Sequence, residues 1–200
     1  MLTVGANAAE VEGELAGGGL GCPCCGGVLA RWGWARRRVL RGGSGPVRLR
    51  PRRARCGGCG VTHVLLPVFA LARRVDLAEV IGAALAAKAA GAGARSIAAG
   101  CGRPVDTVRG WLRRFGSRAG LVRVFFIGLL VEVGIDPVPP AAAPSVFADA
   151  VAAVAGASVA AASRWPGIGE VTPWLLACAA SGGRLLAPGW PEKPVNTSSL

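Results

Sequence analysis

Apolar and polar residues alternate through much of residues 21–68, and this pattern predicts short strands. The alternation is clearest in three segments, residues 28–40, 47–55 and 61–68. Residues 1–20 are rich in glycine, alanine and glutamate without a lasting period, which indicates a mobile tail. The pattern therefore predicts a small antiparallel sheet that follows a flexible N-terminal segment.

Beyond Pro67 the apolar residues recur at helical spacing instead. Four prolines between residues 137 and 144 predict a stiff linker, and Ser145 is a suitable N-cap for the helix that follows it. The expected helices cover residues 76–90, 94–100, 104–115, 121–133, 145–163 and 173–180. We therefore predict an α+β fold that is mainly α.

Two cysteine pairs lie within the region of predicted strands. Cys22 and Cys25 form one C-x2-C pair, Cys56 and Cys59 form a second, and thirty residues separate the two pairs. Two such pairs are typical of a four-thiolate Zn²⁺ site, because each pair places two sulfurs within reach of one tetrahedral ion. The interval is longer than usual, and the glycine-rich loop at residues 42–46 accounts for the excess.

The cysteine pairs change the interpretation of the predicted strands. A sheet this small buries too little surface to fold alone, so the metal would supply the missing free energy of a zinc ribbon at residues 21–68. Cys24 remains an alternative ligand to its neighbours, and His63 is either a ligand or a residue beside the site. The rest of the chain divides into a helix-turn-helix domain at residues 74–120 and an alanine-rich helical region at residues 121–200.

Positive charge is concentrated in one part of the chain. The net charge is +12, but residues 31–123 carry 20 of the 23 basic residues and three acids, a local net of +17. Residues 1–30 and 124–200 are both weakly acidic. A basic block of this density attracts polyanions, and nucleic acid is the commonest partner of such a block.

Residues 97–112 read Ile-Ala-Ala-Gly-Cys-Gly-Arg-Pro-Val-Asp-Thr-Val-Arg-Gly-Trp-Leu and resemble the helix-turn-helix of homeodomain-like transposase and repressor domains. Gly102 can adopt the left-handed turn between the two helices, and Ala98 is small enough for a close helix crossing. Arg103 and Pro104 depart from the pattern, which usually has an apolar residue and a Ser or Thr cap there. The positions that match are Ile97, Ala98, Gly102, Val108, Trp111 and Leu112.

The polar face of the second helix supplies the candidate DNA contacts. In this motif the early residues of the second helix meet base edges and the later ones meet phosphates. We therefore expect Asp106 and Arg109 near bases and Arg113, Arg114 and Arg118 on the backbone. Further candidates are the ribbon arginines Arg52, Arg53 and Arg55. Trp32 and Trp34 stand among arginines, where they would either stack on bases or form the core of the ribbon.

The chain as a whole resembles an uncharacterised bacterial family of zinc-ribbon plus helix-turn-helix proteins that is often met near insertion sequences. The resemblance rests on the CPCCGG knuckle, the stretch from Arg52 through Cys56-Gly-Gly-Cys-Gly-Val-Thr-His63 to Pro67, and the helix-turn-helix. Weaker matches are Ser181-Gly-Gly-Arg-Leu-Leu186 and Asn196-Thr197. The resemblance implies DNA binding connected with a mobile element. The family has no established activity that the resemblance could transfer to this chain.

Several other functions are disfavoured by the sequence. The acids after residue 124, such as Glu132, Asp149 and Glu170, lie in alanine-rich or linker sequence, so we expect no catalytic site. The longest uncharged stretches are too short to span a membrane, and the first thirty residues lack the basic start of a secretory leader. We therefore predict a cytoplasmic, nucleoid-associated protein that binds double-stranded DNA through Zn²⁺-stabilised structure, as a transposition accessory factor or transcriptional regulator. The alternatives are a module that recruits a transposase or self-associates, and a ribbon that binds RNA.

Overall fold

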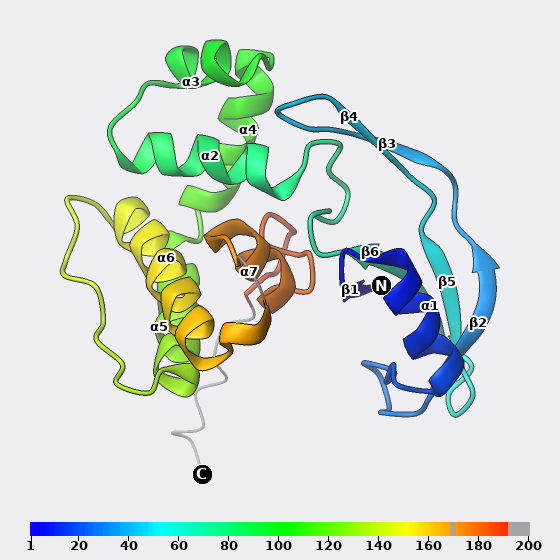
Figure 1. The fold of residues 1–200 in the computed structure, drawn as a ribbon. Coiled ribbons are helices and arrows are strands. Elements are labelled where there is room, and N and C mark those ends of the chain that lie inside the picture. The colour runs from blue at the N-terminus through cyan, green and yellow to red at the C-terminus, as the bar shows by residue number, and fades with distance from the viewer. Residues whose placement is uncertain (169–170, 192–200) are drawn as a thin grey trace.

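The computed structural model describes residues 1–168 and 171–191. The strands lie in the first third of the chain, and helices form the rest (Figure 1). The predicted α+β class, mainly α, is confirmed. Two expected features, Glu170 and the Asn196-Thr197 match, fall outside the described residues.

The main sheet has four strands in the order β1-β6-β5-β2. Antiparallel pairing joins β2 (Leu29–Trp34) to β5 (Arg52–Cys56) and β5 to β6 (Thr62–Pro67). The remaining two strands, β3 (Arg38–Arg41) and β4 (Pro46–Leu49), form a separate hairpin. Figure 1 shows this hairpin extending from the sheet toward the helical half of the molecule.

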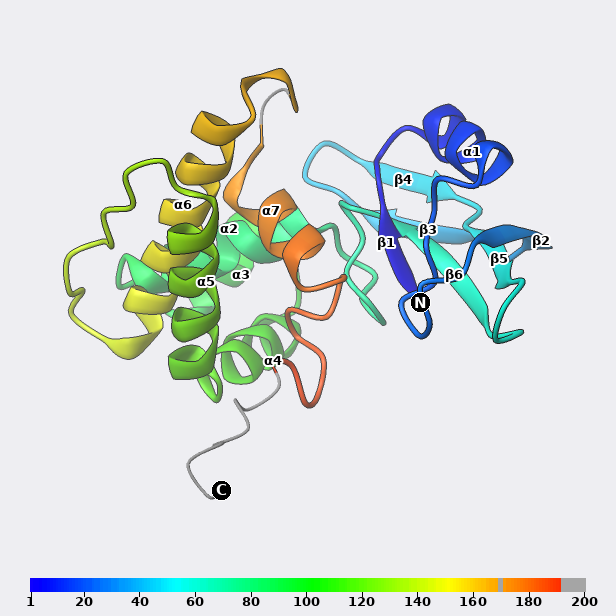
Figure 2. The same ribbon diagram turned by 90° about the horizontal axis from the view of Figure 1, so that it is seen from below.

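The N-terminal segment is folded, and the expectation of a mobile tail was wrong. Strand β1 (Leu2–Val4) pairs in parallel with β6, and helix α1 (Ala8–Gly17) packs against β2 (Figure 2). The Asn7 side chain accepts a hydrogen bond from Ala9 and caps the helix. Val11 and Leu15, one turn apart, are buried in the small core of the sheet. A two-residue apolar face gives too weak a period to be recognised in a glycine- and glutamate-rich sequence.

The long first strand expected at residues 28–40 is interrupted. A β-bulge between Arg31 and Gly33 shifts the register of β2, and the chain leaves the sheet after Trp34. At the base of the hairpin the Ala35 N–H donates to the Pro51 carbonyl, where the two chain segments separate from the sheet. The hairpin thus projects as an arm that leaves the main sheet after β2 and returns to it at β5.

The helices follow the predicted periodicity closely, with bounds that differ by one or two residues. Ser145 caps α6 through its side chain, as expected. They are α2 (Ala78–Ala89), α3 (Ala94–Cys101), α4 (Val105–Gly116), α5 (Ala119–Val133), α6 (Val146–Arg164) and α7 (Pro173–Ala180), with a 3-10 turn at Pro166–Ile168. The proline-containing segment between α5 and α6 has no regular secondary structure.

One hydrophobic core joins all six of these helices, so the expected division at residue 120 does not separate two cores. Trp111 and Phe115 of α4 share that core with Phe126 of α5, Val154 of α6 and Trp174 of α7. Tight crossings are part of this packing, because a Cβ added at Gly82 of α2 would lie 2.0 Å from the Trp174 ring.

Among the described residues, α6 alone is long and apolar enough to cross a membrane by length and composition. The uncharged stretch at residues 150–163, which by itself is too short to span a membrane, is part of the 19-residue helix α6. The core helix of a soluble protein passes the same test, and seven α6 residues are buried, three of them being Ala153, Val154 and Ala157. The length and composition of α6 therefore do not test the expectation that the protein has no membrane partner, which stays a prediction.

A buried carboxylate connects the two halves of the molecule. Asp76, immediately before α2, is 2% exposed and accepts hydrogen bonds from Arg41 at the end of β3 (2.7 Å) and Arg103 before α4 (2.6 Å). Arg103 also donates to the Gly42 carbonyl in the hairpin loop. Backbone hydrogen bonds between Arg41 and residues Val75 and Leu77 support the same contact. The hairpin is therefore fixed to the segments that precede α2 and α4.

Replacing Asp76 with alanine should destabilise the protein by about 3 kcal/mol, because Arg103 would remain buried without a counter-charge. The measurement is urea unfolding followed by circular dichroism. Asp106→Ala is the matched control, since Asp106 is exposed and its ion pair with Arg109 lies on the surface; its change should stay within about 0.5 kcal/mol. Equal effects of the two substitutions would contradict a connecting role for Asp76.

Gly82→Ala should lower the free energy of unfolding by roughly 1–3 kcal/mol or more, because the added methyl overlaps Trp174. Gly128→Ala in α5 is the control, as nothing lies within 4 Å of its added Cβ. That control should instead stabilise the protein by about 0.5–1 kcal/mol through helix propensity. Thermal unfolding of both variants tests the α2–α7 crossing, and a neutral Gly82→Ala would argue against it.

Candidate metal centre and nucleic-acid interface

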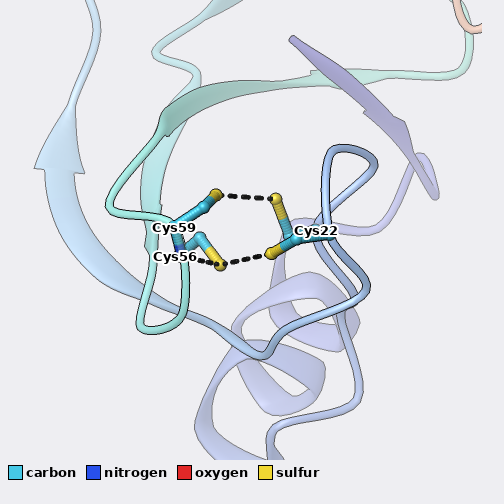
Figure 3. A group of neighbouring side chains, drawn as sticks. Cys22, Cys56 and Cys59 are labelled. Atoms are coloured by element: carbon cyan, nitrogen blue, oxygen red, sulfur yellow. Dashed lines mark hydrogen bonds between the residues drawn. The ribbon is translucent and has the colours of Figure 1, made fainter.

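The four predicted cysteine ligands converge at one end of the sheet. The sulfurs of Cys22, Cys25, Cys56 and Cys59 all lie within 4.8 Å of one another. Cys22 Sγ is 3.7 Å from Cys59 Sγ, and Cys25 Sγ is 3.5 Å from Cys56 Sγ (Figure 3). A tetrahedral ion with metal–sulfur bonds of ~2.3 Å requires sulfur–sulfur edges of ~3.8 Å. The observed spacing is therefore compatible with a metal site.

Tight backbone turns hold the sulfurs in place. Gly26 and Gly60 follow the two pairs with φ of 72°, a left-handed conformation that glycine adopts without strain. The turns direct backbone N–H groups at sulfur, with Cys24 donating to Cys22 Sγ (3.4 Å) and Cys59 to Cys56 Sγ (3.5 Å). Such hydrogen bonds stabilise the thiolate, which is the form that binds a metal.

The electrostatics of the cluster also favour a cation. The backbone N–H of Cys59 is the main cause that lowers the pKa of Cys56 to about 6. The N–H of Val61 lowers the pKa of Cys59, but burial and the neighbouring thiols outweigh it and raise that pKa to about 12. Sulfurs this close therefore do not all ionise together on their own. A bound divalent cation removes the repulsion and allows all four to be thiolates.

The two alternative ligands lie beside the cluster. His63 on β6 is buried, and its Nε2 is 3.4 Å from Cys22 Sγ. Burial, with a smaller effect of the amino-terminal charge, lowers the pKa of His63, so the ring is neutral at pH 7. Cys22, Cys24 and His63 also form a close group. The four-cysteine group supplies a complete tetrahedral set, whereas this group supplies three ligands and shares Cys22 with it.

Two helices flank the glycine at which the sequence predicts a turn. Helix α3 ends at Cys101, Gly102 adopts φ 62° and ψ 39°, and α4 begins at Val105. Ile97 and Ala98 of α3 are buried in the same core as Val108 of α4. The departure at Arg103 has a structural reason, because this side chain reaches back to Asp76 and Gly42 rather than into the core.

The polar face of α4 separates into exposed and engaged arginines. Asp106 and Arg109 are exposed and pair with each other at 3.2 Å, and Arg113 is exposed one turn further on. Arg114 donates to the Gly110 carbonyl within the helix. Arg118 donates to the carbonyls of Ala187 and Trp190, which ties the C-terminal segment to the start of α5. These hydrogen bonds engage the Arg118 guanidinium within the fold, so it is a poor candidate for the phosphate contact that the sequence predicts.

The ribbon arginines and tryptophans are divided between the two faces of the sheet. Arg52 lies 4.2 Å from the centroid of Trp34 and pairs with Glu12 of α1 at 2.6 Å. Arg55, three residues later and therefore on the opposite face, lies 4.7 Å from the centroid of Trp32. Both tryptophans are about half exposed, so they do not form the ribbon core. Arg53 and Arg55 are exposed, whereas Arg52 is mostly engaged.

The predicted DNA contacts do not include the arginines of the β3–β4 hairpin. A hollow of about 300 Å³ on the β3–β4 hairpin is lined by four arginines and no acid, together with Val39 and Leu49. The arginines are Arg37, Arg38, Arg48 and Arg50. The sequence has many arginines on both sides of the glycine-rich loop. It does not show that β3 and β4 pair and so bring these arginines together.

Comparison with known proteins gives a limited result. Residues 22–115, just under half of the chain, are similar to a family described as a domain of unknown function (DUF6431). The matched segment begins at the first metal-ligand candidate and ends at Phe115, in the last turn of α4. No curated protein and no solved structure matches the chain.

The chain should bind one Zn²⁺ per molecule, and Cys56→Ser should abolish tight binding, because three thiolates and a hydroxyl make a much weaker site. Cys24→Ser, in the loop of the other cysteine pair, is the control and should keep the full stoichiometry. The measurement is metal content by mass spectrometry after dialysis against a weak chelator.

Acidification should release the metal, because protons compete for the thiolates. In hydrogen exchange, loss of the metal should expose amides of β2, β5 and β6, while α4 to α6 remain protected by their own core. Retention of the ion by Cys56→Ser, or its loss from Cys24→Ser, would contradict the ligand assignment.

Proposed function

We propose that this protein is a zinc-dependent DNA-binding protein. The observation that carries the proposal is the exposed Asp106, Arg109 and Arg113 face of α4, presented directly after the Gly102 turn. The second helix of this motif enters the major groove of DNA with its early residues against base edges. An arginine at the position of Arg109 can donate two hydrogen bonds to guanine.

Zinc is the metal that the donor set favours. Four cysteine sulfurs in a tetrahedral arrangement bind Zn²⁺ or iron in preference to hard cations, which take oxygen ligands. All four ligand positions are filled by protein, so the ion would have no open position for substrate. We infer a structural ion that stabilises the small sheet and no catalysis at this centre.

The charge of the ribbon supports contact with the phosphate backbone. The hairpin carries arginines on both strands, and Arg53 and Arg55 add to the exposed positive surface of β5. Asp76 fixes this hairpin to the start of the helix-turn-helix. A duplex held by α4 would therefore be met by a second basic surface whose position is set by the fold.

We infer a role as a transposition accessory factor or transcriptional regulator in the cytoplasm, close to the nucleoid. The resemblance of the sequence to proteins near insertion sequences supports the first of these. Recruitment of a transposase, self-association through the C-terminal helices and RNA binding stay predictions, and competition between duplex DNA and single-stranded RNA would decide the last.

The zinc-loaded protein should bind duplex DNA with an affinity that falls steeply as salt rises, because arginines release counterions from phosphates. Arg113→Ala should weaken binding to all sequences alike and reduce the salt slope by about 1. Arg109→Ala should cost about 1–3 kcal/mol on the preferred site and relax its selection while nonspecific binding persists. Fluorescence anisotropy, with a site chosen by DNA selection, measures all three effects.

The matched control is Arg123→Ala. Arg123 is exposed on α5, so its replacement removes the same charge from a different helix. It should change both affinity and salt slope less than Arg113→Ala. A flat salt dependence of the wild-type protein, or identical behaviour of the Arg113 and Arg123 variants, would overturn the proposal.

A further inference from the structure

An open hollow of about 270 Å³ lies between the end of β3, the turn before α2 and one face of α4. Four arginines from three segments of the chain line the hollow: Arg41 at the end of β3, Arg73 and Arg74 before α2, and Arg114 on α4. The other charged residues of its lining are Asp76 and Asp106. The hollow is thus formed by the hairpin and the helix-turn-helix together.

The two carboxylates of the hollow already have partners. Asp76 is bound by Arg41 and Arg103, and Asp106 by Arg109. Within residues 1–168 and 171–191, no carboxylate forms an ion pair with Arg73, Arg74 or Arg114. The hollow therefore has an excess of positive charge that the protein itself does not neutralise.

The arginine pair at the turn shows the consequence of this excess. Arg74 is half-buried and donates to the carbonyls of Arg73 and Leu186, which holds its guanidinium in the wall of the hollow. Burial, followed by the charge of Arg114, lowers the pKa of Arg74. An anion between these side chains would relieve the repulsion and replace lost hydration.

The backbone also takes an uncommon conformation here. Arg73 has φ of 57° and is the one residue other than glycine with positive φ among those described. Such a conformation costs free energy for a side chain of this size. It places the exposed Arg73 side chain at the hollow, opposite α4, where the guanidinium is available to a ligand.

We propose that this hollow binds a phosphate group, with Arg73 and Arg114 as the principal donors and Arg41 and Arg74 at its sides. The planar guanidinium fork matches the paired oxygens of a phosphate and can donate two parallel hydrogen bonds to them. Thr107 and Asp106, in the first turn of α4, form the neighbouring wall.

Two sources could supply the phosphate. A backbone phosphate of DNA lying along α4 would be held jointly by the hairpin and the reading helix, and this source rests on the proposed function. A free inorganic phosphate or small phosphate ester would use the same donors without DNA. The phosphate chemistry is common to both, so the experiment separates them.

The test compares the metal-loaded wild-type chain with an Arg73→Ala, Arg114→Gln double variant and with Arg123→Ala as the charge control. Inorganic phosphate is titrated by calorimetry at constant ionic strength, and duplex DNA is titrated separately by anisotropy. Circular dichroism checks that the double variant keeps its helices, which is expected because Arg73 and Arg114 are exposed. The double variant should lose at least about tenfold in affinity for its phosphate ligand, the range of hydrogen bonds between charged groups.

A specific loss of DNA affinity with a smaller salt slope supports the backbone phosphate, and a loss confined to inorganic phosphate supports a small ligand. If the double variant matches Arg123→Ala in both titrations, the proposal is overturned. Absence of DNA binding by the wild-type protein would remove the proposed function instead, and the phosphate titration would still decide the hollow.

Discussion

The Asp76 carboxylate determines how the two halves of this protein are joined. It is buried between arginines from the β3–β4 hairpin and from the turn of the helix-turn-helix, and it lies at the start of α2. A buried charge with two arginine partners tolerates little displacement, because any separation leaves an uncompensated charge in a poorly hydrated place. The hairpin and α4 therefore have a fixed relation, although the sheet from which the hairpin projects and the helices have separate hydrophobic cores.

Because Asp76 fixes the hairpin to the helical half, the cysteine cluster at the other end of the same strands also affects the position of the hairpin. The hairpin departs from β2 and returns to β5, and β5 ends at the ligand Cys56. The strands that position the sulfurs are thus the same strands that anchor the basic arm. An ion bound by the four cysteines would stabilise this small sheet, and through the sheet it would fix the position from which the arm emerges. On the proposed function, the four-cysteine cluster would act as a scaffold for the basic arm.

The features that the sequence predicted are local ones. Helical periodicity, the Ser145 cap, the cysteine spacing and the Gly102 turn each depend on residues within a few positions, and the structure contains all of them. What was missed depends on contacts between distant segments. Helix α1 is defined by Val11 and Leu15 reaching a core made by β2 and β6, and the bulge in β2 is a property of its pairing with β5. The internal role of Arg118 likewise requires the carbonyl of Trp190, which is 72 residues away.

Arg103 shows how a departure from a motif can carry information. An apolar residue at this position would pack the turn of an isolated helix-turn-helix, whereas Arg103 donates to Asp76 and to the Gly42 carbonyl. At this position the chain therefore has a polar connection to the hairpin. Arg103 also neutralises Asp76 from outside the basic hollow, so that Arg73, Arg74 and Arg114 remain without a carboxylate among the described residues. The residue that joins the two halves therefore pairs with Asp76 without lining the hollow, and it leaves the excess of arginines there in place.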